Sequence, residues 1–376
     1  MNKTFQEFID LINDEAVVKG VPVNGTFELT TRCSLHCRMC FLCNPTNPEP
    51  ELSGEQWLDI MTQARDAGML FAMITGGEPL LHKDFWDIYL GLRKLGVYIT
   101  LNTNGTTITP EIADRLKENP PLRMQLSLYG SSPEAYEKST GSAEAFSKAI
   151  TGLDLLIDRG LEVRPRTILT KDTADDMVNL VPLILSYGAP FSCGNYVLPV
   201  IFENNNNPQK LRLSESELSK YTKVIEDAIK NYYEQHGDPR AELKEKIKKE
   251  YEAAAEKPVD PAREELKEHA KAIRGATQFN CCAGISRFSI SYDGLIRLCE
   301  ISRHPAFDLK AMSFAEGFEM LRKATAEIPL CAECSDCEYK NICSPCPPRH
   351  YIETGDFNKK AEYVCTYVKA GVKLAE

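Results

Sequence analysis

The chain has 376 residues, of which 43% are hydrophobic, and its 44 basic and 54 acidic residues give a net charge of −10. This composition supports a buried core and excludes a disordered chain, while the negative charge argues against bulk electrostatic binding to nucleic acid or to an anionic membrane. No apolar run approaches the roughly 18–20 residues of a membrane span, and residues 1–20 lack the basic and apolar regions of a signal peptide, so we expect a cytoplasmic protein with no nucleic-acid or membrane partner.

Residues 1–24 predict a short helical lead-in, and residues 25–202 alternate short apolar runs with amphipathic stretches. The apolar runs predict strands at 26–30, 71–75, 98–102, 124–128, 163–169 and 192–198. The stretches between them predict helices at 53–67, 83–95, 110–118, 133–139 with 144–159, and 174–187. Helices that join successive strands imply parallel pairing. The pattern therefore predicts an α/β fold, a partial (β/α)6 barrel of the TIM type, with its active site at the carboxyl ends of the strands.

The rest of the chain changes character twice. Residues 203–275 are rich in charge and predict a helical linker that Pro258 and Pro261 interrupt. This linker is either a solvated connection or a docking surface for a partner peptide. Residues 276–376 are dense in cysteine and begin with a predicted hairpin, in which runs at 288–292 and 296–299 flank Asp293-Gly294.

Fourteen cysteines in a reducing compartment indicate metal or redox sites and not disulfides. Three of them, Cys33, Cys37 and Cys40, follow the first predicted strand with the spacing C-x3-C-x2-C. Iron–sulfur clusters usually take four cysteines, so a set of three leaves one iron open to another ligand. A zinc site with His36 as the fourth ligand is the alternative.

A glycine pair follows the second predicted strand, in Gly76-Gly77-Glu78-Pro79. Two glycines let the backbone approach a ligand closely, and a carboxylate beside them can hold an ammonium group. Seen alone, the pair would be an ordinary turn.

Together, the cysteine triad and Gly76-Gly77-Glu78-Pro79 on a β/α repeat resemble the radical S-adenosylmethionine (SAM) superfamily. The resemblance implies a 4Fe–4S cluster on the three cysteines, with SAM chelated at the open iron. It also implies reductive cleavage of SAM to a 5′-deoxyadenosyl radical that abstracts a substrate hydrogen. Residues 76–78, with Pro79 closing the motif, would bind the methionyl amino group.

The same resemblance suggests further cofactor contacts. Ser127, on the fourth strand, would contact the methionyl or ribose part of SAM, and Asn102 and Thr103 would end the third strand in the same pocket. Met39 stands where the family often has an aromatic residue near the adenine. The basic residue that the family has after the fourth strand is Lys138 or Arg166.

The C-terminal cysteines are similar to the SPASM extension of this superfamily. The matching pattern is Cys281-x12-Gly294-x4-Cys299, then Cys334-x2-Cys337-x5-Cys343-x2-Cys346, then Cys365, and its last internal spacing is one residue shorter than the family's x3. The resemblance implies two auxiliary 4Fe–4S clusters, and so three clusters in all. The outer one would use Cys334, Cys337, Cys343 and Cys365, and the inner one would use Cys281, Cys299 and Cys346.

Four points around these sites stay open. The inner cluster has an open iron for a substrate thiolate, unless Cys331 or Cys282 closes it. Cys282 also satisfies the spacing to Gly294, so either it or Cys281 is the ligand. Glu300 follows Cys299, where some relatives place a base that deprotonates the substrate, and the alternative is an exposed charge at the end of a hairpin. The remaining thiols, Cys43 and Cys193, are expected to be unligated.

SPASM proteins commonly modify ribosomally made peptides, so the resemblance implies an oxidoreductase that acts as a peptide maturase and installs a cross-link such as a thioether. The alternatives are maturation of a sulfatase by formylglycine formation, maturation of another enzyme or cofactor, and, in another class, a non-enzymatic electron carrier. We expect a ferredoxin or flavodoxin as electron donor and an anaerobic or strongly reducing cytoplasm. Residues 1–24 are too few for a winged-helix leader-binding domain, so leader recognition would come from residues 203–275 or from a separate protein, or would not be needed at all.

Overall fold

The computed structural model describes residues 5–42, 50–201, 206–239, 241, 245–246, 248–249, 260–277, 279, 281–329, 331–339, 342–343 and 346–371. Its centre is one curved sheet in which six strands run parallel and pair in the order β6-β5-β4-β3-β2-β1. These strands are β1 (Asn24–Glu28), β2 (Phe71–Thr75), β3 (Tyr98–Thr103), β4 (Arg123–Ser127), β5 (Val163–Ile168) and β6 (Cys193–Gly194).

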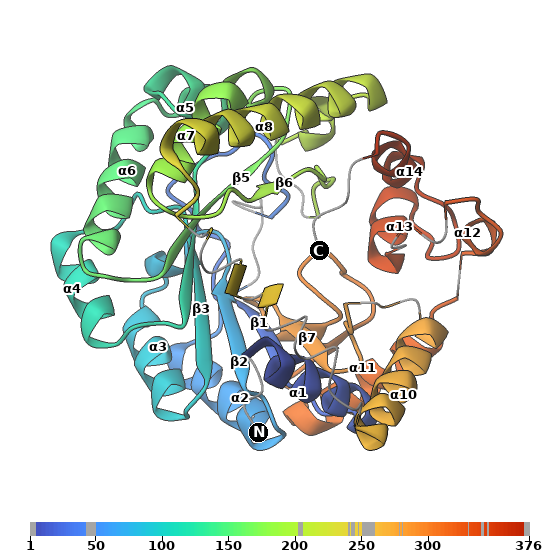
Figure 1. The fold of residues 1–376 in the computed structure, drawn as a ribbon. Helices are drawn as coiled ribbons and strands as arrows, with labels where there is room; N and C mark the ends of the chain where they lie inside the picture. The colour runs from blue at the N-terminus through green and yellow to red at the C-terminus, as the bar shows by residue number, and fades with distance from the viewer. Residues whose placement is uncertain are drawn as a thin grey trace.

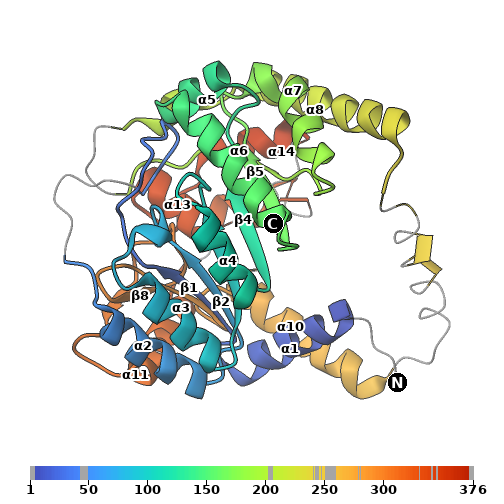
Figure 2. The ribbon, with the colours of Figure 1, turned by 90° about the vertical axis from the view of Figure 1, so that its left-hand side faces the viewer.

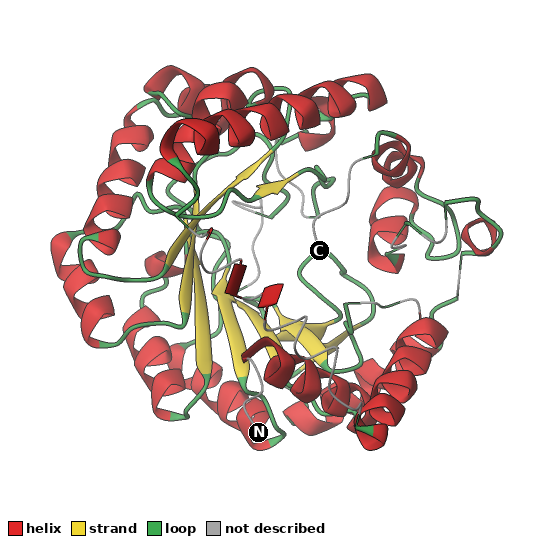
Figure 3. Ribbon diagram, in the orientation of Figure 1, coloured by secondary structure: helices red, strands yellow, loops and turns green. Residues whose placement is uncertain are grey.

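The connecting helices form an arc outside the strands, and the sheet does not close on itself (Figures 1 and 3). They are α2 (Gly54–Asp66), α3 (Phe85–Lys94), α4 (Pro110–Glu118), α5 (Pro133–Thr140), α6 (Glu144–Ile157) and α7 (Met177–Ser186). The open parallel barrel predicted from the strand and helix alternation is confirmed. Within the described part of the chain, every helix is too short or too polar to span a membrane.

Local sequence signals explain these elements. Ser53 caps α2 in a reciprocal capping box with Gln56, which satisfies two backbone N–H groups at the helix start. The buried face of α2 then places Trp57 against Phe27 of β1, with ring centroids 6.1 Å apart in an edge-to-face contact. The hydrophobic core therefore lies between the sheet and its outer helices and leaves the strand ends free for a site.

Five of the six predicted strands agree with the structure to within two residues. The sixth prediction, residues 192–198, was too long, because only Cys193–Gly194 pairs with β5. The following residues leave the sheet to meet the C-terminal helices: the Tyr196 hydroxyl donates to Glu353, and the Val197 carbonyl accepts from Arg212. A sequence with a high propensity for strands thus packs the core against the C-terminal region without forming a strand.

The C-terminal hairpin joins the core sheet, which the sequence did not predict. Strands β7 (Arg287–Ile290), β8 (Leu295–Arg297) and β9 (Ala306–Asp308) pair in this order, each antiparallel to its neighbour, and β7 pairs parallel with β1. The sheet thus has nine strands within the described residues. Helix α11 (Phe314–Ala326) covers this end, with the Phe314 and Phe288 rings 4.9 Å apart. The cysteine-rich region is therefore anchored directly on the core.

Two further helices lie side by side at the edge of the molecule (Figures 1 and 2). They are α1 (Phe5–Lys19) and α10 (Pro261–Thr277), and Arg274 of α10 forms an ion pair of 2.7 Å with Asp14 of α1. Helix α8 (Glu215–His236) packs on α7 through Ala228, Val181 and Leu185. Within residues 203–275, these contacts make α8 and α10 parts of the folded body.

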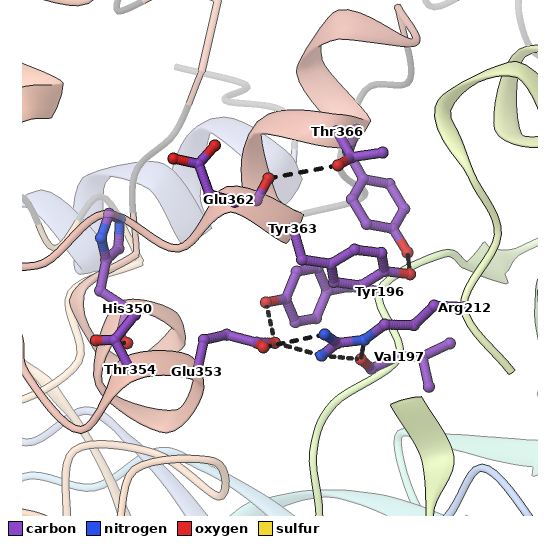
Figure 4. Close-up of polar contacts among 10 residues, drawn as sticks. Tyr196, Val197, Arg212, His350, Glu353, Thr354, Glu362, Tyr363 and Thr366 are labelled. Atoms are coloured by element: carbon purple, nitrogen blue, oxygen red, sulfur yellow. Dashed lines mark hydrogen bonds and ion pairs between the residues drawn. The ribbon is translucent and has the colours of Figure 1, made fainter. Parts of the chain in front are cut away.

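The short helices α12 (Ala332–Ser335), α13 (Pro347–Thr354) and α14 (Glu362–Lys369) lie on the open side of the barrel (Figure 1). A polar joint holds α13 and α14 to the segment after β6 (Figure 4). Arg212 pairs with Glu353 of α13, donates to the Val197 carbonyl and stacks its guanidinium 3.8 Å from the Tyr363 ring of α14. We call this group, with Tyr196, the Arg212 joint.

Candidate active site and auxiliary metal sites

A cavity of about 360 Å³ lies at the carboxyl ends of the parallel strands. Its lining comes from the loop after β1, from the ends of β2 to β5 and from the hairpin region. Half of the predicted site residues meet there, namely Cys33, Cys37, Cys40, Gly76, Gly77, Asn102, Thr103, Ser127, Arg166 and Glu300. Met39 lines it as well. One cavity therefore unites groups that are up to 267 positions apart in the sequence (300 − 33).

The cysteine loop is held in place from two sides. The Asn206 amide donates to the carbonyls of Cys37 and Cys40 at 3.0 and 2.9 Å. The Asn104 amide lies 3.5 Å from the Cys33 sulfur. Burial, and then the neighbouring thiols Cys40 and Cys33, raise the pKa of Cys37 well above its ordinary value. A bound cation or cluster would lower this pKa and convert the Cys37 thiol, like its two half-buried neighbours, to a thiolate ligand.

The zinc alternative with His36 finds no support in this geometry. His36 is exposed and lies outside the lining of the cavity, whereas the three cysteines all line it. The three-thiol set fits an iron–sulfur cluster with one position left for another ligand.

The two glycines bring the β2 loop against the cysteine loop. The Gly77 N–H donates to the Thr30 carbonyl at 2.7 Å, and the Glu78 N–H donates to the Arg32 carbonyl at 2.8 Å. A Cβ at Gly77 would lie 2.3 Å from the Arg32 carbonyl oxygen, and Gly76 has a φ of 141°. Only glycine therefore allows this close backbone approach beside the three thiols.

Glu78 is placed differently from the prediction. Its carboxylate is fully buried outside the cavity lining and accepts from the Thr103 hydroxyl at 2.9 Å and from the Asn104 N–H at 2.7 Å. Burial raises its pKa to about 7. In this position the Glu78 carboxylate holds the Asn104 backbone, whose side-chain amide lies beside the Cys33 sulfur. Pro79 is buried at the start of a 3-10 turn (Pro79–Leu81) and does not line the cavity either.

Of the two alternative basic residues, Arg166 and Lys138, only Arg166 lines the cavity. Arg166 of β5 lines the cavity and donates to the Gln125 amide oxygen at 2.6 Å. Lys138 is exposed on α5 and lies outside the lining. Arg166 is therefore the one of the pair that can meet a ligand in the cavity.

Glu28 is a residue that the sequence reasoning missed. It ends β1, is 1% exposed, lines the cavity and lies 3.6 Å from the Arg303 guanidinium. Burial raises its pKa to about 7, with Arg303 opposing and Glu300 and Asp293 adding to the rise. The sequence signal that could have identified Glu28 is an acidic residue inside the apolar run 26–30. Burying a charge in such a strand costs free energy, so an acidic residue there indicates a functional or paired group. Glu28 and Glu300 thus face one cavity from opposite halves of the chain.

The predicted outer auxiliary set gathers around a second, smaller cavity of about 40 Å³. Cys334, Cys337, Cys343 and Cys365 all line it, together with His350 and Lys360. Four soft sulfur donors around one space fit a 4Fe–4S cluster.

The predicted inner set also comes together. Burial raises the pKa of Cys299 well above its ordinary value, and Glu300, Cys346 and Cys281 raise it further, which places these thiols near one another. Cys282, in contrast, has a positive φ of 64° and its sulfur accepts from the Arg274 Nε at 3.3 Å. The structure therefore turns Cys282 toward α10 and leaves Cys281 with Cys299 and Cys346.

The remaining thiols differ in kind. Burial raises the pKa of Cys193 to about 12, and its S–H points to the Gly194 carbonyl at 3.3 Å, so it is a packed, protonated thiol. Cys43 lies outside the described residues.

Comparison with known proteins agrees with this site. Residues 27–184 match the model of the Radical SAM superfamily, and this stretch holds the cysteine triad, the glycine pair and strands β2 to β5. The chain therefore carries a radical SAM domain over residues 27–184, which supports an enzymatic role.

Individual relatives cover different shares of the chain. It is similar to the AdoMet-dependent heme synthase of Methanosarcina barkeri, at 23% identity over 91% of this chain and 95% of that protein. It is also similar to the PqqA peptide cyclase of Streptomyces rochei, at 35% identity over 45% of this chain and 47% of that protein. Among solved structures, SuiB of Streptococcus suis bound to precursor peptide SuiA shares the fold, with a TM-score of 0.66 at 17% identity over 97% of this chain and 82% of that one.

Proposed function

We propose that the chain is a maturase that abstracts a hydrogen from a ribosomally made peptide and installs a cross-link, such as a thioether between a cysteine sulfur and a carbon. The observation that carries the proposal is the single cavity in which the cysteine triad and the glycine pair face Glu28 and Glu300, with Cys299 next in sequence to Glu300. Because these groups line one cavity, the site that would generate the radical, the two carboxyl groups and the neighbouring Cys299 can all reach the same substrate. The 35% identity to a peptide cyclase supports a peptide as that substrate.

The chain would hold the cofactors as follows. Cys33, Cys37 and Cys40 bind a 4Fe–4S cluster, and the backbone of Gly76 and Gly77 cradles SAM. Asn102, Thr103, Ser127 and Arg166 line the rest of the SAM pocket. When bound, the cluster and SAM together supply a 5′-deoxyadenosyl radical that takes a hydrogen atom from the substrate.

Forming a thioether from a thiol and a C–H group removes two hydrogens from the peptide. One leaves as an atom to the 5′-deoxyadenosyl group, and the thiol hydrogen leaves as a proton that needs a base. Glu300 and Glu28 are the carboxyl groups that line the cavity and can take it. Cys281, Cys299 and Cys346 would hold the inner auxiliary cluster, which would supply the acceptor for the remaining electron.

The outer auxiliary cluster, on Cys334, Cys337, Cys343 and Cys365, would connect this path to an external ferredoxin or flavodoxin. Three clusters with a substrate-facing iron suit an anaerobic or strongly reducing cytoplasm. A leader peptide, where the substrate carries one, would bind the charged segment 203–275 or a separate protein.

The test uses the full chain, loaded anaerobically with iron and sulfide, reduced, and supplied with SAM and a cysteine-bearing peptide encoded beside its gene. The expected result is 5′-deoxyadenosine together with a peptide that has lost two hydrogens and no longer reacts with a thiol-alkylating reagent. Cys37→Ala should abolish both products. If Glu300→Gln forms the cross-link at the wild-type rate, Glu300 is not the base.

A second candidate is heme synthesis. The relative with that activity aligns with 91% of this chain, whereas the peptide cyclase aligns with 45%. Turnover of an iron porphyrin precursor to heme in the same assay, with no change in the peptide, would favour this function. Formation of an aldehyde on a cysteine peptide would instead favour formylglycine maturation of a sulfatase.

A further inference from the structure

Three possible metal ligands, Cys331, Cys334 and His350, come together in the C-terminal region. The predicted clusters do not use these three residues together. The sulfurs of Cys331 and Cys334 and a ring nitrogen of His350 all lie within 4.8 Å of one another. A tetrahedral zinc ion with Zn–S near 2.3 Å and Zn–N near 2.0–2.1 Å needs donors roughly 3.5–3.8 Å apart. Small side-chain adjustments therefore suffice for these three to bind one ion.

The backbone around the two cysteines already has a suitable form. The N–H groups of Cys334 and Ser335 both donate to the Cys331 carbonyl, at 3.0 and 3.2 Å. This turn brings the two sulfurs of a C-x2-C pair together, and C-x2-C is a common spacing of zinc ligands. Cys331 is 2% exposed, so its thiol is buried in the protein and not presented to solvent.

His350 carries a second, independent sign of a metal ligand. Its ring is 2% exposed, and its Nδ1 lies 3.0 Å from the Lys359 carbonyl oxygen. A carbonyl oxygen can only accept, so Nδ1 must carry the hydrogen, and in the neutral ring Nε2 keeps the lone pair. Histidines that bind metals are typically oriented by such a bond from the other ring nitrogen.

Only Cys334 of the three belongs to the predicted outer cluster set. The outer region thus offers six possible ligands, the five thiols of Cys331, Cys334, Cys337, Cys343 and Cys365 and the imidazole of His350, where a 4Fe–4S cluster takes four. The donors fall into two overlapping sets that share Cys334.

We propose that Cys331, Cys334 and His350 bind one zinc-class divalent ion when the outer cluster is absent, with solvent as the fourth ligand. Binding displaces the protons of the two thiols and involves no change of oxidation state. Because both sets need Cys334, zinc and the outer cluster exclude each other, and cluster insertion has to release the ion. This inference does not depend on the identity of the substrate.

The test uses the full chain with Cys343→Ser and Cys365→Ser, so that the outer cluster cannot form. The protein is loaded with iron and sulfide to fill the other two cluster sites, then exposed to zinc and desalted. Elemental analysis should find one zinc per chain, and zinc-edge X-ray absorption should find two sulfur ligands and one imidazole nitrogen.

Variants in this background separate the two donor sets. Cys331→Ser and His350→Ala should each weaken zinc binding by more than the roughly 10–100-fold that loss of an outer-shell partner costs. Cys337→Ser is the matched control, because Cys337 lines the same small cavity but is not one of the three donors, and it should leave zinc binding unchanged. The proposal is overturned if the parent binds no zinc. It is equally overturned if zinc is lost with Cys337→Ser and kept in both other variants.

Discussion

The Arg212 joint gives a sharp prediction about how the auxiliary region is held on the core (Figure 4). The Arg212 and Glu353 side chains are 14% and 9% exposed, and the Nη1–Oε2 distance is 3.0 Å. Arg212 also donates to the Val197 carbonyl through Nε and Nη2, at 3.0 and 2.9 Å. Substitution of Arg212 by Met keeps most of the side-chain volume and removes every one of these donors.

The expected cost follows from burial. Removing one partner of a buried ion pair leaves the other charge uncompensated and costs about 3–5 kcal/mol. If the 376 residues unfold together, their unfolding entropy of about 0.8 kcal/mol/K converts this cost into a fall in Tm of about 4–6 °C. Cys346 precedes α13 and Cys365 lies on α14, so iron at the auxiliary sites should fall more than iron at the triad.

The assay is anaerobic thermal unfolding followed by circular dichroism, with iron counted per chain. Lys223→Met is a matched control, because its pair with Asp227 is 68% and 49% exposed and such surface pairs contribute about 0–1 kcal/mol. The double variant Arg212→Met/Glu353→Met should recover much of the loss, since it buries no lone charge. If Arg212→Met lowers Tm no more than Lys223→Met, the joint does not hold the two parts together.

Three other predictions concern the site itself. Gly77→Ala should abolish SAM binding measured by equilibrium dialysis, because the alanine Cβ would lie 2.3 Å from the Arg32 carbonyl oxygen. Unchanged SAM binding would contradict the proposal that the backbone of Gly76 and Gly77 holds SAM. Burial raises the pKa of Glu28 from 4.5 to about 7, so between these values the folded chain holds a proton that the unfolded chain has lost. Stability should therefore fall as pH rises through this window, by about 3 kcal/mol, and stay lower above it. Glu78 has a pKa raised to about 7 as well and contributes its own fall in this window, so Glu28→Gln should remove only the Glu28 share. Parallel Tm–pH curves for variant and wild type would contradict the assignment. Cys281→Ser should lower the iron content per chain, whereas Cys282→Ser should leave it unchanged. A loss of iron from Cys282→Ser alone would identify Cys282, and not Cys281, as the ligand.

The fold was predictable where it depends on local pattern. Apolar runs separated by amphipathic helices fixed five strands, and the spacing of Cys33, Cys37 and Cys40 after the first of them located the site. Parallel strands bring their carboxyl ends to one edge, so the gathering of Gly77, Ser127 and Arg166 also followed.

The rest depends on contacts between distant segments. Pairing of β7 with β1 joins residues more than 250 positions apart, and nothing in either strand specifies the other. The prediction extended β6 to residue 198 because Tyr196 and Val197 have a high propensity for strands. In the structure these residues instead pack against α13 and α14. Glu78 sits in a recognised motif, but its direction is decided by Thr103 and Asn104, which lie 25 and 26 positions further along.

The central claim is that a radical formed beside Cys33, Cys37 and Cys40 takes its hydrogen from a peptide in the same cavity. The most direct measurement is isotope transfer, using the anaerobically loaded chain and a precursor peptide deuterated at the carbon that becomes cross-linked. The account predicts deuterium in the 5′-deoxyadenosine that is released, in proportion to the cross-linked peptide, and neither product from Cys37→Ala. Release of 5′-deoxyadenosine without deuterium while the peptide is modified, or modification of the peptide by Cys37→Ala, would contradict it.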